Sequence, residues 1–453
     1  MANHSASLGT QSISRLLIKQ AVPASIGILV MSIYGIVDTI FVGRFVGGNG
    51  IAAITVVMPI TFLIGSIGMA IGVGGGSIIS RALGAGEGRK ACITFGNQIT
   101  LTMGLSILIV SLGWIFQDQV LALYGGKGEV LAPAREYYRV VLLGVPFLAW
   151  AMMSNNIIRA EGEPRMAMYS MILPAVTNMI LDPIFIVGFD MGMAGAGYAT
   201  VFGYASSAAL SFWFFSSGRS ELSFYLDNFR LRWAIVKEIF AIGGVTMARQ
   251  GAISLLSIVL NNMLFAYGQE TALTVYGMIS RTLMFANFPV VGLIQGFLPI
   301  AGYNYGAKKY DRVKETIKLS ILSGTVISFM IFTSLMLFTR NFLSIYTEDE
   351  QLLAEATPAL RIVFFATPLL CMQLIGSAFY QAIGKALPAL LLALAKQGIC
   401  LIPLLLILPS IFGLEAIWWS FPIADVLAAT LSYIFLRIGT AKRLGGKVQS
   451  VAD

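Results

Sequence analysis

Long apolar stretches, separated by short charged or glycine-rich segments, recur along the whole chain. A helix of about 20 apolar residues crosses the hydrocarbon core of a bilayer. We read twelve such spans, near residues 16–43, 51–82, 93–116, 134–156, 166–189, 196–217, 238–267, 272–304, 317–339, 358–382, 386–409 and 416–437. Only helices and closed barrels satisfy their backbone in lipid, and these runs lack the alternation of barrel strands. The sequence therefore predicts an all-α polytopic membrane protein.

Composition supports the same class. The chain is 57% hydrophobic and 11% charged, so it has too few charged residues to cover a soluble surface. The net charge of +8 comes from basic residues that are spread between the apolar runs, which argues against nucleic acid as a partner. The three cysteines lack CxxC spacing, so neither a zinc site nor a disulfide framework is indicated. We expect no cofactor.

The basic residues also predict an orientation. If both termini lie in the cytoplasm, most of the 30 lysines and arginines fall in cytoplasmic segments, and only a few, such as Arg135 and Arg340, fall outside. The positive-inside rule favours this arrangement.

The chain repeats itself at an offset of 222 residues. This offset pairs Gly84 with Gly306, Ala85 with Ala307, Lys90 with Arg312, Thr94 with Thr316, Arg139 with Arg361, Pro146 with Pro368 and Gly162 with Gly384. Because six is an even number of spans, the two halves enter the membrane from the same side. We therefore expect two six-helix lobes related by a pseudo-two-fold axis along the membrane normal, a plan that recurs in transporters.

The predicted organisation follows from these spans and the repeat. It consists of a cytoplasmic tail over 1–15, an N-terminal lobe over 16–217, a cytoplasmic linker over 218–237, a C-terminal lobe over 238–437 and a cytoplasmic tail over 438–453.

Three carboxylates fall well inside the spans: Asp38, Asp182 and Asp425. A charged Asp at a helix centre costs about 2.5–3.5 kcal/mol on insertion scales, so such groups usually face a cavity or an ion pathway. A structural aspartate, hydrogen-bonded to a neighbouring helix, is the alternative at each position. Asn178 lies one helical turn before Asp182, and Pro183 removes a backbone donor beside them. Oxygen ligands of this kind suit a hard cation such as Na⁺.

The surroundings of these aspartates differ between the halves. Tyr34 precedes Asp38 by one turn, and Pro23 predicts a bend in the first helix. In the second half Ile402 precedes Pro403 where the first half has Asp182, so we expect the cation site in the first half. Arg249, Arg281 and Lys396 also fall inside spans. The sequence does not tell which of them, if any, pairs with Asp425.

Several motifs together resemble the multidrug and toxic compound extrusion (MATE) transporters, in their bacterial multidrug-efflux branch. They are NNIIRAEGEP, NMILDPIFIVG, the GAGYAT of residues 195–200 and the QGFLPIAGYNYGA of residues 295–307. The resemblance implies a bacterial inner-membrane antiporter that exports organic cations or drugs in exchange for Na⁺ or H⁺ by alternating access.

Residue by residue, the resemblance implies roles for eight positions. It gives a cation-binding site, with Na⁺ as one candidate ion, at Asp38, Asn178, Asp182 and Thr200, lined by Tyr34, Tyr137 and Asn155, with the first-helix bend at Pro23. Many relatives carry a second-lobe glutamate where this chain has Asn261 and Asn262. That departure puts a second-lobe coupling site in doubt.

Two other function classes remain open at this stage. A flippase for lipid-linked precursors would share the helical plan but would favour a basic cavity for phosphate groups. An enzyme would need a nucleophile with a base or metal ligands inside the spans, and the single histidine, His4, lies outside them. We expect a non-enzyme, monomeric in the lipid bilayer. The sequence identifies neither the substrates nor the coupling ion.

Overall fold

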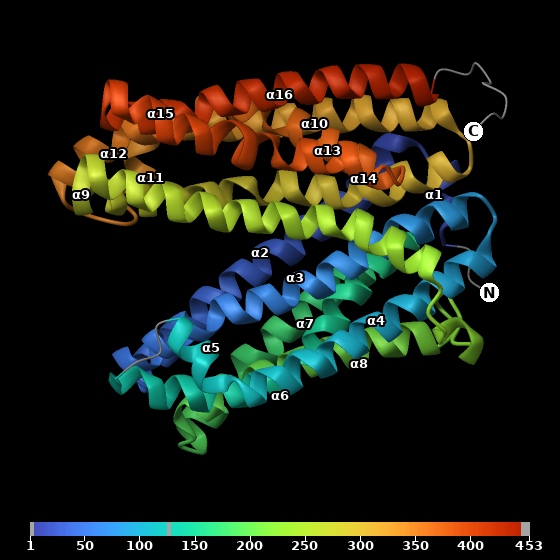
Figure 1. Ribbon diagram of the computed structural model, residues 1–453, viewed down its shortest axis with the longest axis horizontal. Helices are drawn as coiled ribbons and strands as arrows, with labels where there is room; N and C mark the ends of the chain where they lie inside the picture. Colours follow the sequence, from blue (N-terminus) through green and yellow to red (C-terminus); the bar gives the residue numbers. More distant parts are fainter. Residues whose placement is uncertain (1–3, 125–127, 445–453) are drawn as a thin grey trace. The chain divides into compact units, whose positions relative to one another are not determined.

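The computed structural model describes residues 4–124 and 128–444 (Figure 1). Parts of both predicted tails, residues 1–3 and 445–453, lie outside this range. Every regular element within it is helical, which confirms the all-α class. In the first half the elements are α1 (Ala6–Thr10), α2 (Ile13–Phe45), α3 (Gly48–Gly84), α4 (Gly88–Ile115), α5 (Gln117–Leu123), η1 (Gly128–Val130), α6 (Leu131–Ala160), α7 (Pro164–Asp182), η2 (Pro183–Gly188), α8 (Gly192–Ser216) and η3 (Leu226–Phe229).

The second half follows the same order. Its elements are α9 (Trp233–Gly306), α10 (Tyr310–Leu337), α11 (Thr339–Leu343), α12 (Glu350–Val363), η4 (Thr367–Leu369), α13 (Leu370–Ala382), α14 (Ala386–Leu394), η5 (Ala395–Leu401), α15 (Ile402–Phe412) and α16 (Leu414–Leu444).

Ten helical segments in the described residues are long and apolar enough to cross a membrane. One of them, α9, is two helices joined at Gln269, whose φ of 53° and ψ of −148° are not helical. The 25-residue helix α8 is not among the ten, although it occupies the sixth predicted span. With α9 divided and α8 included, the described helices match the twelve predicted spans.

The helix starts repeat at the offset read from the sequence. Helices α4, α5, α7 and α8 begin 222 residues before α10, α11, α14 and α16, respectively. The left-handed backbone positions repeat as well: Gly86 with φ 76° corresponds to Lys308 with φ 57°. Two halves with one backbone plan are the structural counterpart of the duplicated sequence.

The chain forms two compact units, and each unit includes the first turns of one helix whose remainder belongs to the other unit. Unit 1 contains the residues up to Thr10 and Ile26–Gly244, and unit 2 contains Gln11–Ser25 and the residues from Val245 on. Helix α2 is therefore divided just after Pro23, and α9 just after Gly244. Within unit 1, α3 packs mainly against α6, and α6 against α8; within unit 2, α13 and α15 both pack against α16.

Glycines allow these exchanged helix starts to pack closely. In unit 1 a Cβ on Gly74 of α3 would overlap the carbonyl oxygen of Ile239, and a Cβ on Gly243 of α9 would overlap that of Ala70. Gly296, the counterpart of Gly74, meets Gln20 and Ala21 of α2 in the same way within unit 2. Small residues at these points bring helix backbones into contact, which is how helices associate in lipid.

A buried carboxylate holds the segment between the halves against unit 1. Glu161, between α6 and α7, is 0% exposed and accepts hydrogen bonds from Ser220 Oγ at 2.7 Å and from the Glu221 amide at 3.0 Å. Glu221 in turn accepts from the amide and hydroxyl of Ser5, and His4 pairs with Glu163 at 2.8 Å. Burial, with a smaller contribution from the neighbouring carboxylates, raises the pKa of Glu161 to about 8, against the opposing effect of its hydrogen bonds.

Gly243→Ala should destabilise the protein by about 1–3 kcal/mol, because the added methyl group overpacks a backbone contact. The adjacent Gly244→Ala is the matched control, since its Cβ would meet nothing within 4 Å. Thermal unfolding of the purified protein in detergent measures the difference. Equal melting temperatures for the two variants would contradict the close packing of α3 and α9.

The Glu161→Gln variant should become more stable than the parent protein as the pH rises from about 5 to 9. The raised pKa of Glu161 means that the folded state favours the protonated form of this side chain. Its contribution to the free energy of unfolding is therefore full below its ordinary pKa and is lost as the pH rises through about 8. The amide mimics the protonated acid at every pH. Melting temperatures across this range should converge at pH 5 and separate at pH 9, whereas the exposed Glu355→Gln should show no such trend.

Candidate cation-binding site

Asp182 lies at the end of α7, where the regular helix changes. Pro183 has no N–H to donate to the carbonyl of Met179, and the chain continues as the π-helical segment η2. Single π-helical turns often occur at functional sites in helices. Asp182 is 0% exposed, and Asp38 and Asn178, which it contacts, belong to unit 1.

The second carboxylate, Asp38 of α2, contacts Asp182 directly. Asp38 is 7% exposed, and its carboxyl is in hydrogen-bonding contact with that of Asp182. The Oδ1 atom of each residue is buried without a hydrogen-bond partner among the described residues. Two acidic groups that were distant in the sequence therefore form one site, with oxygen atoms free to accept a proton or a cation.

Asn178 and Thr200 complete the polar part of this site. With its amide nitrogen toward the carboxylate, Asn178 donates to Asp182 Oδ2 at 2.7 Å, and its oxygen accepts from the Thr200 amide at 3.2 Å. This orientation matches donors with acceptors at both ends of the amide. Thr200 of α8 donates its hydroxyl to the carbonyl of Ala196. The predicted set Asp38, Asn178, Asp182 and Thr200 thus comes together from three helices.

Three tyrosines line the same site. The side chains of Tyr34 and Tyr137 both lie beside Thr200. Tyr204 interacts electrostatically with both tyrosines and with Asp38. The sequence analysis missed Tyr204, although it follows Thr200 by one helical turn and therefore lies on the same face of α8.

The donor chemistry of the site fits a small hard cation. The side chains of the polar set offer carboxylate, amide and hydroxyl oxygens, the ligands that Na⁺ and similar ions prefer. Two touching carboxylates repel when both are ionised, so one proton or one bound cation relieves that repulsion. The donor groups of this site are therefore chemically suited to hold either a proton or a small hard cation.

Asn155 and Pro23 have other surroundings among the described residues. Asn155 donates to the carbonyl of Ala167 at 2.6 Å and to Ser170 Oγ at 2.9 Å, which ties α6 to α7. No contact between Asn155 and either aspartate is recorded among the described residues. Pro23 is inside α2, close to the point where that helix passes from one unit to the other.

The second half has no copy of this site. At the 222-residue offset, the counterparts of the seven polar residues are Leu256, Leu260, Ala359, Cys400, Leu404, Pro422 and Val426. The offset from the helix starts places Leu404, rather than Ile402, at the position of Asp182, and both are apolar. Leu256, Leu260 and Ala359 belong to the hydrophobic core of unit 2, and Cys400 and Leu404 pack against it. Asn261 and Asn262 are exposed.

A buried ion pair lies near this apolar counterpart. Lys396 Nζ is 2.6 Å from Asp425 Oδ1, and the two side chains are 17% and 6% exposed. Lys396 belongs to the π-helical segment η5 and Asp425 to α16. Arg249 instead donates to Ser377 Oγ at 3.3 Å, and Arg281 is exposed. The structure therefore identifies Lys396 as the partner of Asp425.

The chain is similar to known proteins over almost all of its length. The family model described as MatE matches it twice, over residues 23–184 and 246–407. The multidrug export protein MepA of Staphylococcus haemolyticus (strain JCSC1435) is 31% identical over 423 residues, which cover 93% of this chain and 92% of that protein. MepA of Staphylococcus aureus (strain MRSA252) is 29% identical over 416 residues, with 92% of each chain covered.

Solved structures share the fold. A crystal structure of a MATE protein in the bent conformation has a TM-score of 0.92 at 24% identity, and one in the straight conformation has 0.91 at 23%; each comparison covers 98% of this chain and 99% of the other. A transporter of the MOP superfamily from Pyrococcus furiosus has a TM-score of 0.90 at 25% identity over the same shares. The two matches to one family model, one in each half, and the relatives of similar length show that the chain belongs to the MATE family of transporters.

Proposed function

We propose that the protein is a secondary active antiporter that exports organic cations or drugs in exchange for Na⁺ or H⁺ by alternating access. The observation that carries this proposal is the buried contact between Asp38 and Asp182, each with an unpartnered carboxylate oxygen. The names of the relatives, multidrug export protein MepA, support the substrate class. The carboxylates also disfavour a phosphate-bearing substrate in this site.

Competition for the two carboxylates would couple the ion to the substrate. An organic cation is held best when the pair carries negative charge, and a proton or Na⁺ bound there lowers that charge. A ligand shifts a conformational equilibrium only through its differential affinity for the two states. Inward movement of the ion would then accompany the release of substrate on the outer side. The aromatic rings of Tyr34, Tyr137 and Tyr204 would add favourable contacts for a cation.

We propose that the second half binds no exchangeable cation. Lys396 already provides a covalently tethered positive charge to Asp425, at 2.6 Å, so this carboxylate has its counter-ion in place. The apolar residues at the counterparts of Asp38 and Asp182 offer no oxygen ligand. We therefore place the coupling site in unit 1 alone.

We further propose that the protein resides in the bacterial inner membrane with both termini in the cytoplasm. Ten long apolar helical segments and the family support a membrane location, and the distribution of lysine and arginine supports the orientation.

Asp182→Asn should abolish ion-coupled export while leaving a folded protein, because the amide keeps the size of the side chain but loses its exchangeable charge. The assay is efflux of a fluorescent organic cation from proteoliposomes under separately imposed Na⁺ and pH gradients. The paired variant Lys396→Met with Asp425→Asn is the control; since it removes both partners of a buried ion pair, it should retain coupled export. Export by Asp182→Asn at the parent rate would reject the coupling role.

The apparent Kd for an organic cation should rise with Na⁺ or with proton concentration, by up to about tenfold for each tenfold increase in the competing ion, the limit for one-for-one exchange. Equilibrium binding of the fluorescent cation to the purified protein measures this effect. The dependence should disappear in Asp182→Asn. A parent Kd that is unchanged by both ions would remove the competition mechanism and leave Asp182 with a structural role.

A further inference from the structure

A basic groove lies in unit 2 between the start of α10 and the end of α16, which pack against each other. Its volume is about 450 Å³, and it is lined by Lys314, Ile317, Lys318, Arg437, Thr440 and Ala441. Ile317 and Ala441 give it apolar walls, whereas Lys314, Lys318 and Arg437 are exposed to solvent. None of these residues belongs to the cation-binding site.

The charge of the groove is only partly neutralised. Lys314 lies 3.3 Å from Asp311, whose side chain is 99% exposed. For Lys318 and Arg437, no ion pair or hydrogen bond of the charged group is recorded among the described residues. Glu315 follows Lys314 along α10 but does not line the groove. Two cations from two different helices are thus available to one anion.

Apolar surface continues from the groove along both helices. Leu322, one turn beyond Lys318 on α10, is 57% exposed. Ile434 and Ile438, on either side of Arg437 on α16, are 46% and 60% exposed. Because α10 leaves the groove as α16 approaches it, these side chains lie on the membrane-spanning parts of both helices. A ligand with an anionic head and long apolar chains matches this pattern.

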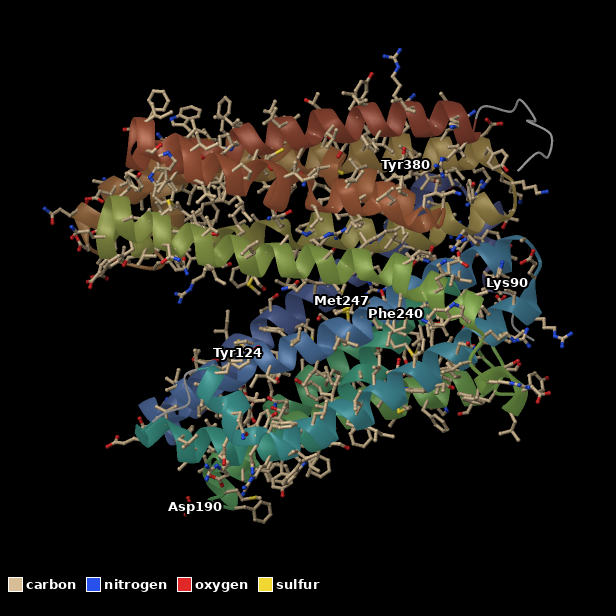
Figure 2. All side chains as sticks on the ribbon, in the orientation of Figure 1. Lys90, Tyr124, Asp190, Phe240, Met247 and Tyr380 are labelled. Carbon is tan, nitrogen blue, oxygen red and sulfur yellow. The ribbon has the colours of Figure 1, made fainter. Side chains whose placement is uncertain are left out.

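The end of α16 is held in place beside the groove. Tyr380 of α13, labelled in Figure 2, donates its hydroxyl to the carbonyl of Phe435 at 2.6 Å. The guanidinium of Arg443 lies 5.7 Å from the centre of the same ring. These contacts fix the backbone that carries Arg437, so the groove is formed without a ligand.

We propose that this groove binds the phosphate of an anionic phospholipid, with the acyl chains along α10 and α16. Basic pockets between membrane helices on the cytoplasmic side are suited to anionic headgroups. The cytoplasmic position rests on the proposed orientation, whereas the site itself does not depend on what the protein transports. A free phosphate would use the same cations but would gain nothing from Leu322, Ile434 or Ile438.

A comparable groove in unit 1 differs from this one because its lining contains an acidic residue. Its lining includes Arg89, Lys90 and Arg232 but also Glu87, which lies 3.4 Å from Lys90. A carboxylate inside the groove offsets one of its cations and repels an anionic headgroup. The groove in unit 2 has no acid in its lining.

The test is a lipid titration of the delipidated full chain in detergent, followed by native mass spectrometry, with dioleoyl phosphatidylglycerol and dioleoyl phosphatidylcholine as probes. The variant Lys318→Gln with Arg437→Gln should raise the Kd for phosphatidylglycerol by roughly thirtyfold, about fivefold for each cation, and should leave phosphatidylcholine unchanged. Arg15→Gln with Lys385→Gln, two exposed cations of unit 2 outside the groove, is the matched control and should bind like the parent.

Two further arms separate a lipid from free phosphate. Leu322→Ser should weaken phosphatidylglycerol binding, since this side chain would contact an acyl chain, and millimolar inorganic phosphate should not displace the lipid. Displacement by inorganic phosphate would identify a simple anion site and overturn the proposal. An equal loss in the control variant would also overturn it, because the effect would then come from overall surface charge. Coupled export is measured separately, so failure of this site leaves the proposed antiport intact.

Discussion

The hydrocarbon core of the bilayer offers no water to satisfy a polar group, and this constraint governs every level of the structure. It requires the backbone to form helices, and within the described residues all regular elements are helical. It also removes most of the hydrophobic drive between helices, so contact depends on small residues that allow backbones to meet. Gly74 and Gly243 show this in unit 1, and Gly296 repeats it in unit 2.

The same lack of water means that each buried charge needs a compensating group nearby. In unit 1, Asp38 and Asp182 meet each other and the neutral amide of Asn178, and the described residues give neither carboxylate an ion pair with a basic side chain. In unit 2, Asp425 meets the ammonium of Lys396, and its compensation is part of the chain. We propose that the aspartate pair of unit 1 is open to exchange, whereas Asp425 is paired within the protein.

Duplication explains how one backbone came to carry both arrangements. Four pairs of helix starts agree at the offset of 222 residues, yet Pro174 and Gly203 of the first half correspond to Lys396 and Asp425 of the second. A Cβ on Gly203 would lie 2.9 Å from the carbonyl oxygen of Pro174, so these positions are already adjacent in the first half. Two adjacent positions that are uncharged in the first half hold an ion pair in the second, whereas most positions of the polar site in the first half correspond to residues in or packed against the hydrophobic core of unit 2.

The class of the protein, its twelve spans and its repeat could be predicted from the sequence, because apolar length and helix-breaking residues act locally. It also singled out Asp38, Asn178 and Asp182, since a carboxylate inside an apolar run is conspicuous and its helical neighbours lie one turn away, whereas Thr200 was added by the family resemblance alone. Which groups meet across helices became clear only from the folded structure. Contact between Asp38 and Asp182, the choice of Lys396 over Arg249 and Arg281, the hydrogen bonds of Asn155 and the place of Tyr204 depend on how distant helices pack. No local pattern in the chain encodes those distances.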